Sequence, residues 1–437
     1  MTMPFPDAAE LRTATDVSIE EYPRFAVIRR HRDLDPVADV AGAARAAIDD
    51  LSLGDLSSGA SIAITAGSRG IRDMPTVLSA AVDELLNRGF EPFVVPAMGS
   101  HGGATERGQR KTLASLGVTE ESVGCEIRSS MAVDAVGQDS MEQDVYVSGD
   151  ALDADAIVLA NRVKPHTDFS GAIESGLCKM AVVGLGKHHG AESLHNAGLA
   201  GDFSDVIADR ARVIIEETPI AGGVALIEDV HERATIVEGI PAEQLLAREP
   251  ELLERAYEEL PMLPVDDLDL LIVDEIGKEI SGTGMDTNVL GRYRFHGATE
   301  PETPTITRIY ARSLTEASHG NALGIGLADF VHRDLVEEMD VTDTYVNIVT
   351  SGEPERSKLP FVVPDDRTAL TIIPSTIGLK DLSELRIARI KNTLDLDELV
   401  VSEPIARELQ ARENVSVGPL EPLELRQGDL SPAPYSE

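Results

Sequence analysis

Hydrophobic and polar positions follow one another in a regular order along the chain. Residues 61–66 (SIAITA), 91–96 (EPFVVP) and 155–160 (DAIVLA) are short apolar runs, each followed by a loop of glycine or polar residues. Between the first two runs, residues 75–89 have the pattern of a helix that begins at a proline and ends at a glycine. This alternation of strand and helix is typical of α/β proteins with mostly parallel sheets.

The same pattern divides the chain into two α/β domains. The charged helical stretch 242–260 is followed by two prolines, and a new apolar strand at 268–273 opens a second region. A length of 437 residues allows roughly two or three domains. We therefore predict an N-terminal domain at 1–262, a C-terminal domain at 263–395, a returning segment at 396–414 that packs on the first domain, and a loose tail at 415–437.

The charge of the chain excludes some classes of partner. Lys and Arg total 38 and Asp and Glu total 76, which gives a net charge of −38. Phosphate backbones and anionic membrane surfaces are repelled by such a protein, so we expect no nucleic-acid or membrane partner. Only eight of the basic residues are lysines, a composition typical of halophilic proteins, whose fold depends on salt to screen self-repulsion.

Targeting and redox signals are few. The N-terminus has neither a basic nor an apolar region of a secretory signal, and no apolar run approaches the roughly 18 residues of a membrane span. Two cysteines, Cys125 and Cys178, cannot form a disulfide framework or a cysteine-rich metal site. We therefore expect a cytoplasmic protein.

Histidines mark the loops that follow two predicted strands. His101 lies in the glycine-rich loop after 91–96, and His166 lies in the loop after 155–160. Ligands of open α/β sheets bind at the carboxyl ends of strands, so both histidines are expected to face one crevice. Two imidazoles there suit acid–base chemistry on a substrate between them. The alternative is that these histidines are merely exposed or cap loops.

Four of the eight lysines lie in or beside the same segments: Lys164, Lys179, Lys187 and Lys278. Lys179 lies within an apolar stretch, 173–185, that is predicted as a helix. An ammonium there is costly unless it is paired or used covalently. The alternative is a lysine at a helix edge whose amine reaches solvent.

Two further patterns are compatible with ligands. His188 and His195 are seven residues apart and share one helix face, which is a weak metal signal, and a solvated polar face is the commoner interpretation. The loops 67–72 and 280–288 are rich in glycine and are followed or accompanied by arginines, a combination that can hold a phosphate or carboxylate. For the loop 280–288, a tight capped turn explains the pattern equally well.

Taken in order and spacing, several of these residues resemble the nickel-dependent lactate racemase family of 2-hydroxyacid racemases and epimerases. The resemblance rests on Ser68-Arg69, GSHG at 99–102, KPH at 164–166, Lys179 and His195. It implies two α/β domains around an interdomain active-site cleft. It also implies a nickel-pincer nucleotide cofactor (nickel pyridinium-3,5-bisthiocarboxylic acid mononucleotide) and a small-molecule 2-hydroxyacid substrate.

The resemblance also assigns roles to residues of this chain. His101 and His166 correspond to the paired acid–base histidines, Lys179 to the lysine that tethers the cofactor, and His195 to the nickel ligand. Ser68 falls in the cofactor-binding loop. Arg69 and Arg294 correspond to residues that bind the substrate carboxylate.

The implied reaction is reversible hydride abstraction from C2 through a 2-ketoacid, with one histidine on each side of the substrate. The chain departs from the lactate enzymes in having Ala66 in place of an aspartate, and Gly291 and Arg294 in place of a glutamine and a lysine. These changes favour a larger or more anionic hydroxyacid than lactate. A lyase or oxidoreductase acting on a sugar acid, and a non-catalytic protein that binds the cofactor or a metabolite, are the alternatives on the same scaffold.

Overall fold

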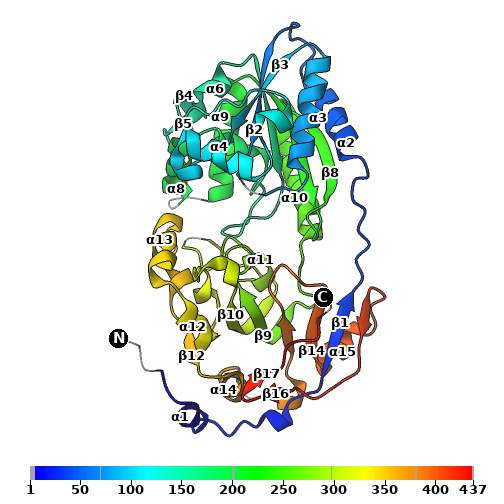
Figure 1. The fold of residues 1–437 in the computed structure, drawn as a ribbon, viewed down its shortest axis with the longest axis vertical. Helices are drawn as coiled ribbons and strands as arrows, with labels where there is room; N and C mark the ends of the chain where they lie inside the picture. Colours follow the sequence, from blue (N-terminus) through cyan, green and yellow to red (C-terminus); the bar gives the residue numbers. More distant parts are fainter. Residues whose placement is uncertain (1–4, 69, 199–201, 297, 379–380, 436–437) are drawn as a thin grey trace. The chain divides into compact units, whose positions relative to one another are not determined.

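The computed structural model describes residues 5–68, 70–198, 202–296, 298–378 and 381–435, apart from the side chains of residues 195, 196, 198, 350 and 351. Its contacts divide the chain into two compact units. Leu34–Leu260 forms the first, here called the central unit, and the two ends of the chain, residues 1–33 and 261–437, together form the terminal unit. Both are α/β structures with mostly parallel sheets, which confirms the predicted fold class (Figure 1).

The central unit is built on a five-stranded sheet with the order β3-β2-β6-β7-β8. The first four strands are parallel and β8 is antiparallel to β7. The strands are β2 (Ser61–Ala66), β3 (Glu91–Pro96), β6 (Ala156–Arg162), β7 (Ile220–Glu228) and β8 (Ala234–Pro241), and a separate hairpin consists of β4 (Val133–Gln138) and β5 (Asp144–Ser148).

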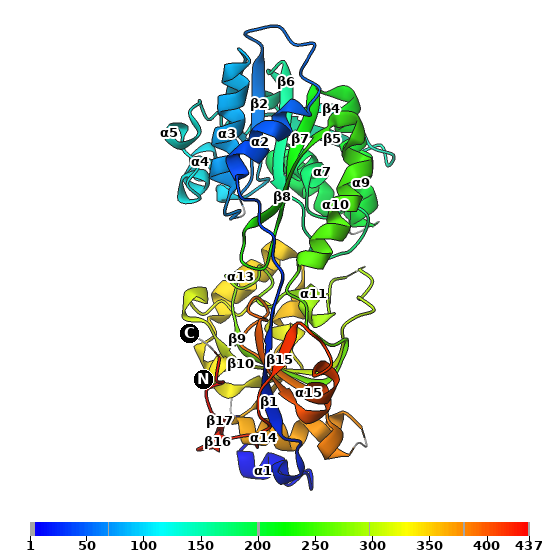
Figure 2. The ribbon, with the colours of Figure 1, turned by 90° about the vertical axis from the view of Figure 1, so that its right-hand side faces the viewer.

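Side chains of these strands alternate between two cores, as a pleated sheet buried on both faces requires. Ile62 and Ile64 pack with α2 and α3 on one face, whereas Ala63 belongs to the core on the opposite face. Figure 2 shows α2 and α3 on one side of the sheet and α9 and α10 on the other. The helices of this unit are α2 (Val40–Asp49), α3 (Met74–Asn87), α4 (Glu106–Ser115), α5 (Glu120–Val123), α6 (Gly149–Leu152), α7 (Leu177–Lys179), the π-helical turn η3 (Met180–Gly184), α8 (Lys187–Gly198), α9 (Phe203–Glu217) and α10 (Leu245–Glu259).

The terminal unit has an eight-stranded sheet with the order β12-β11-β10-β9-β13-β14-β1-β15. The strands from β12 to β13 are parallel, and β14, β1 and β15 continue the sheet in antiparallel pairs. The strands are β1 (Phe25–Arg30), β9 (Asp267–Ile276), β10 (Thr305–Leu314), β11 (Phe330–His332), β12 (Phe361–Val363), β13 (Ile387–Ile390), β14 (Glu398–Ser402) and β15 (Val415–Val417), with the short pair β16 (Leu425–Arg426) and β17 (Asp429–Leu430). The helices are α1 (Ala8–Arg12), α11 (Thr287–Leu290), α12 (Arg333–Glu338), α13 (Val341–Ser351), α14 (Asp366–Ile372) and α15 (Glu403–Leu409).

The ends of the chain differ from the predicted domain plan. Residues 1–33 were expected in the first domain, but β1 pairs with β14 and β15 and therefore lies in the terminal unit. The segment 396–414 pairs with β1 and β13 of that same unit, so it does not return to the central unit. The expected loose tail is also wrong for residues 415–435, where Leu430 is buried in the core and the hydroxyl of Tyr435 donates to the carbonyl of Arg389.

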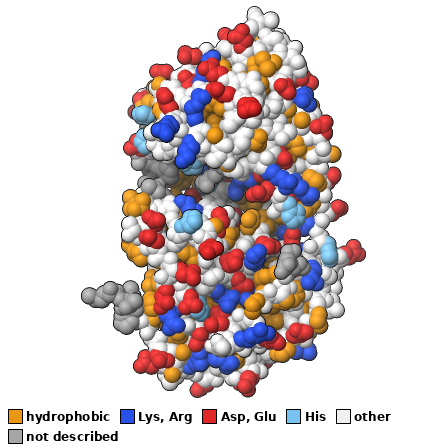
Figure 3. Space-filling model, viewed as in Figure 1, with side chains coloured by type: hydrophobic (Ala, Val, Ile, Leu, Met, Phe, Trp, Pro, Cys, Tyr) orange, Lys and Arg blue, Asp and Glu red, His pale blue; other side chains and the backbone are white. Residues whose placement is uncertain are grey.

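The surface agrees with the acidic composition. On the face drawn in Figure 3, acidic side chains are spread over both units and basic side chains lie among them. Many of these charges form ion pairs within a unit, such as Arg248 with Glu238 and Arg386 with Glu408. Among the helices in the described part of the chain, none combines the length and the apolarity that crossing a membrane demands.

Candidate functional site

The predicted residues of the central unit gather where its strand order reverses. The chain runs from β2 to β3 on one side and later to β6 on the other side of β2, and all three strands are parallel. Their carboxyl ends therefore lie side by side, and this reversal is the position at which open α/β sheets bind ligands. The loops that follow the three strands carry Ser68, His101 and His166 respectively.

Ser68 and His101 are in direct contact across the ends of β2 and β3. The Ser68 hydroxyl forms a short hydrogen bond with Nδ1 of His101. The His101 loop bends through Gly99, whose φ of 57° is in the left-handed region, and a Cβ at that glycine would lie 3.2 Å from Cγ1 of Val183. The loop thus packs directly on the turn η3 while His101 stays exposed.

His166 is held by a buried carboxylate. Glu174, 1% exposed, accepts hydrogen bonds from the backbone N–H of His166 (2.6 Å), the backbone N–H of Gly171 (3.0 Å) and the hydroxyl of Tyr257 (2.9 Å). Burial raises the pKa of Glu174, although the three donors oppose the shift. These bonds fold residues 164–175 into a compact loop rather than the first turn of a helix.

The orientation of the His166 ring defines its tautomer. The backbone N–H of Asp168 donates to Nδ1 of His166 at 3.1 Å. Because a backbone N–H can only donate, Nδ1 is the acceptor, and the neutral ring carries its proton on Nε2. The ring also stacks on Phe169, with centroids 4.4 Å apart.

Lys179 lies beside the same aromatic ring. It is half-buried, and its Nζ lies 5.6 Å from the centroid of Phe169, within the range of a cation–π contact. The positive charge of Lys179 partly offsets the rise in the pKa of Glu174 that burial causes. His166 and Lys179 are therefore brought together through Phe169, whereas the sequence gives no sign of this link.

The helix that carries Lys179 starts at a buried carboxylate from α10. Glu249 accepts the backbone N–H of Cys178 at 2.9 Å, and burial raises the pKa of Glu249 to about 7. A Cβ on Gly176 would lie 2.4 Å from Oε1 of Glu249, so only glycine allows this approach. The predicted helix 173–185 consequently begins at Leu177, because the preceding residues are used by the Glu174 loop.

Lys187 is the fully buried lysine of this region. Its side chain is 0% exposed, its Nζ donates to the carbonyl of Pro96 at 2.6 Å and to Oε1 of Gln109 at 3.3 Å, and burial lowers its pKa to about 8. The scarcity of lysine pointed to Lys187 as well as to Lys179, but the cost of a buried ammonium was considered only for Lys179. The burial of Lys187 depends on its contacts with β3 and α4, and no local sequence pattern predicts these contacts.

The other predicted residues lie outside the described part of this site or in the terminal unit. Arg69 lies outside the described residues, and His195 lies in α8 with its side chain outside them. Arg294 belongs to the terminal unit, where its guanidinium donates to the carbonyl of Gly326 and lies 3.4 Å from Asp329. Burial and the neighbouring Arg292 lower the pKa of Arg294. His188 is exposed and lies 3.9 Å from Glu192 on the next turn.

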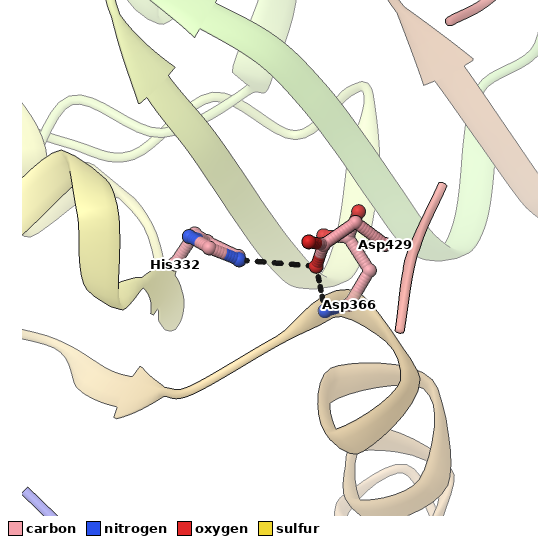
Figure 4. A group of neighbouring side chains, drawn as sticks. All are labelled: His332, Asp366 and Asp429. Atoms are coloured by element: carbon pink, nitrogen blue, oxygen red, sulfur yellow. Dashed lines mark hydrogen bonds and ion pairs between the residues drawn. The ribbon is translucent and has the colours of Figure 1, made fainter. Parts of the chain in front are cut away.

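The terminal unit contains a second cluster of potential metal ligands, His332, Asp366 and Asp429 (Figure 4). Oδ1 of Asp429 lies 3.3 Å from Nε2 of His332 and accepts the backbone N–H of Asp366 at 3.1 Å. The carboxylate of Asp366 accepts from Tyr310, from the backbone of Leu430 and from the guanidinium of Arg312. The Asp366 oxygens are thus satisfied by protein donors and by the charge of Arg312 rather than by a metal ion. Because Asp429 and Leu430 of β17 both bond to Asp366, the cluster holds the C-terminal segment in place.

Comparisons with known proteins agree with the fold. A family model described as a domain of unknown function (DUF362) matches residues 66–244, from the end of β2 to the residues just before α10. No curated protein matches the chain. Among solved structures, the lactate racemase apoprotein from Thermoanaerobacterium thermosaccharolyticum is similar, with a TM-score of 0.53 and 13% identity over 87% of this chain and 95% of that chain. At this identity the likeness shows a common scaffold, which is that of a lactate-racemase-like α/β protein.

Proposed function

We propose that this protein is a racemase or epimerase of a 2-hydroxyacid that uses a nickel-pincer nucleotide. The observation that carries the proposal is the convergence of Ser68 with His101, and of His166 with Lys179, at the strand-order reversal of one sheet. Acid–base side chains and an amine at that position suit chemistry on a small bound substrate. The likeness of the whole fold to a lactate racemase apoprotein supports the same class.

The residues of the site fit such a cofactor. Among the described atoms, none lies within 4 Å of the positions that Cβ atoms of Gly70 and Gly103 would occupy, so the loops after β2 and β3 leave room at this edge. Lys179 would tether the cofactor through its amine, Ser68 would lie in the cofactor-binding loop, and His195 would supply an imidazole, a ligand type that nickel accepts. When bound, the cofactor would accept a hydride from C2 of the substrate and return it.

The two histidines differ in what they offer the substrate. His166 carries its proton on Nε2 in the neutral form, because Nδ1 accepts the N–H of Asp168, so neutral His166 can donate a hydrogen bond to the substrate oxygen, whereas proton transfer from it requires the imidazolium. The hydroxyl of Ser68 both donates and accepts, so His101 can carry its proton on Nδ1 and use Nε2 as a base. In one direction neutral His101 would take the hydroxyl proton and His166, as the imidazolium with Nδ1–H turned towards the carboxylate of Asp168 3.8 Å away, would return a proton to the substrate oxygen. In the other direction the charge states and roles of the two histidines would exchange, as racemisation demands.

Chiral chromatography of a panel of 2-hydroxyacids tests this proposal. Each acid is supplied as one enantiomer to the protein purified from its native host in high salt. We expect the opposite stereoisomer of one acid to appear with unchanged mass. We also expect His101→Asn and His166→Asn to reduce its rate at least about a hundredfold, the range of general acid–base catalysis, with Tm unchanged. A product of altered mass would point to a lyase or oxidoreductase, and full activity of both variants would contradict the assigned bases.

A further inference from the structure

A buried polar chain connects the start of α8 to the loop that carries His101. Lys187 donates to the carbonyl of Pro96, the last residue of β3, and to Oε1 of Gln109. Gln109, itself 0% exposed, donates from Nε2 to the carbonyl of Gly99 at 3.0 Å and lies 3.5 Å from that of His101. The orientation of the amide is therefore fixed, because its oxygen faces an ammonium and its nitrogen faces two carbonyls.

This arrangement is costly for the fold. Among the described residues, no carboxylate lies within ion-pair distance of Lys187. The more distant charges of Asp150 and Glu106 raise its pKa, but burial outweighs them and disfavours the ammonium. The backbone of Lys187 is also in the left-handed region, with a φ of 53°, which is strained for a residue that has a side chain. Strained and desolvated groups of this kind concentrate at functional sites.

The carbonyls that Gln109 holds belong to the residues that set the position of His101. Gly99 makes the bend of the loop, and His101 carries the imidazole that contacts Ser68. We propose that Lys187 and Gln109 are positioning residues for His101: the buried pair fixes the two carbonyls and thereby keeps the imidazole on the hydroxyl of Ser68. The inference rests on the proposed function, in which His101 is a base, but the geometry it describes can be measured without turnover.

The test follows the His101 imidazole by ¹⁵N NMR of the folded protein labelled at histidine. His101→Gln identifies the signal by its loss, and Ser68→Ala gives the signal of an imidazole without its partner. We expect Gln109→Leu and Lys187→Met to move the His101 signal towards its position in Ser68→Ala. Lys111→Met, which removes an exposed lysine of α4, should leave the signal in place.

Gln109→Glu separates positioning from stability. A glutamate keeps an acceptor beside Lys187 and adds a negative charge there, and its Tm shows whether the variant stays as stable as the wild type. It cannot donate to Gly99, so the His101 signal should still move. The proposal would be overturned if the His101 signal were unchanged in folded Gln109→Glu and Gln109→Leu. If Gln109→Leu does not fold, the His101 signal of Gln109→Glu is the deciding measurement.

Kinetics distinguish this inference from the proposed function. If the protein racemises a hydroxyacid, Gln109→Glu should lower kcat about tenfold to a hundredfold, the effect of a displaced catalytic group, with KM changed less than about threefold. An unchanged kcat in that variant would overturn the positioning role and leave the racemase assignment standing. A displaced His101 signal in a protein that racemises no hydroxyacid would support the positioning geometry while the proposed function fails.

Discussion

Replacing Glu249 with glutamine should change how the stability of the central unit depends on pH. The carboxylate of Glu249 is fully buried at the start of the helix that carries Lys179, and burial raises its pKa from 4.5 to about 7. Because the pKa of Glu249 is higher in the folded state, the folded protein binds this proton more tightly than the unfolded chain. At pH values between 4.5 and about 7, the folded protein keeps the proton and the unfolded chain loses it. The contribution to stability is therefore present at low pH and is lost as pH rises through 7.

The magnitude follows from the shift. A difference of about 2.5 pKa units is worth about 3 kcal/mol over the full range, and about 2 kcal/mol of it falls between pH 5.5 and pH 8.5. Glutamine keeps an oxygen that accepts the N–H of Cys178 but carries no charge. Other carboxylates that titrate in this window, such as Glu174, are common to both proteins and cancel in the difference.

The assay is urea unfolding at constant high potassium chloride, combined with hydrogen exchange of peptides covering residues 176–185. Stability of the wild type relative to Glu249→Gln should fall by about 2 kcal/mol from pH 5.5 to pH 8.5. Glu254→Gln, at an exposed position of α10, should show no such change relative to the wild type. Parallel pH profiles for wild type and Glu249→Gln, or a difference of opposite sign, would refute the argument.

Three other perturbations test the account. Burial lowers the pKa of Lys187 from 10.5 to about 8, so the unfolded chain binds the proton more tightly and wild-type stability should rise by about 2 kcal/mol between pH 7.5 and pH 10; Lys187→Met should lack this rise in urea unfolding, and an equal rise would contradict it. Asp366→Asn removes the buried carboxylate that pairs with the partly buried Arg312 and should destabilise the terminal unit by about 3 kcal/mol, measured as exchange of amides around α14; a loss below about 1 kcal/mol would contradict a structural role for the cluster. Lowering potassium chloride from about 2 M to 0.1 M lengthens the screening distance from a few ångströms to about 10 Å, so Tm should fall steeply at a net charge of −38, and a constant Tm would argue against halophilic adaptation.

Local pattern was sufficient for β2, β3, β6 and β9, four strands of the parallel parts of the sheets. The apolar runs at 61–66 and 91–96 correspond to β2 and β3, because buried parallel strands are short, apolar and bounded by loops. The pairing of β1 with β14 joins residues 369 to 377 positions apart, and no local signal specifies such a partner. For this reason both ends of the chain were assigned to the wrong part of the molecule.

Burial of charged groups was the second limit. Lys179 lies in an apolar stretch, which left open a paired or covalently used amine and a lysine at a helix edge; the structure places its amine near the ring of Phe169 at a half-buried position. Lys187 lies between Gly186 and His188 and is fully buried, because β3 and α4 pack around its side chain. Glu174 orders the His166 loop and accepts from Tyr257 of α10, and Glu249 of α10 accepts the N–H of Cys178 at the start of the helix that carries Lys179. Both contacts join residues far apart in the sequence, so no local pattern predicts them.

Nickel content and the mass of the peptide that contains Lys179, determined on protein purified from its native host in high salt, test the central claim most directly. We expect one nickel per chain and a covalent adduct that maps to Lys179, and Lys179→Ala should lose the adduct while remaining folded. Folded wild-type protein from that host with neither nickel nor an adduct at Lys179 would contradict the assignment as a nickel-pincer enzyme.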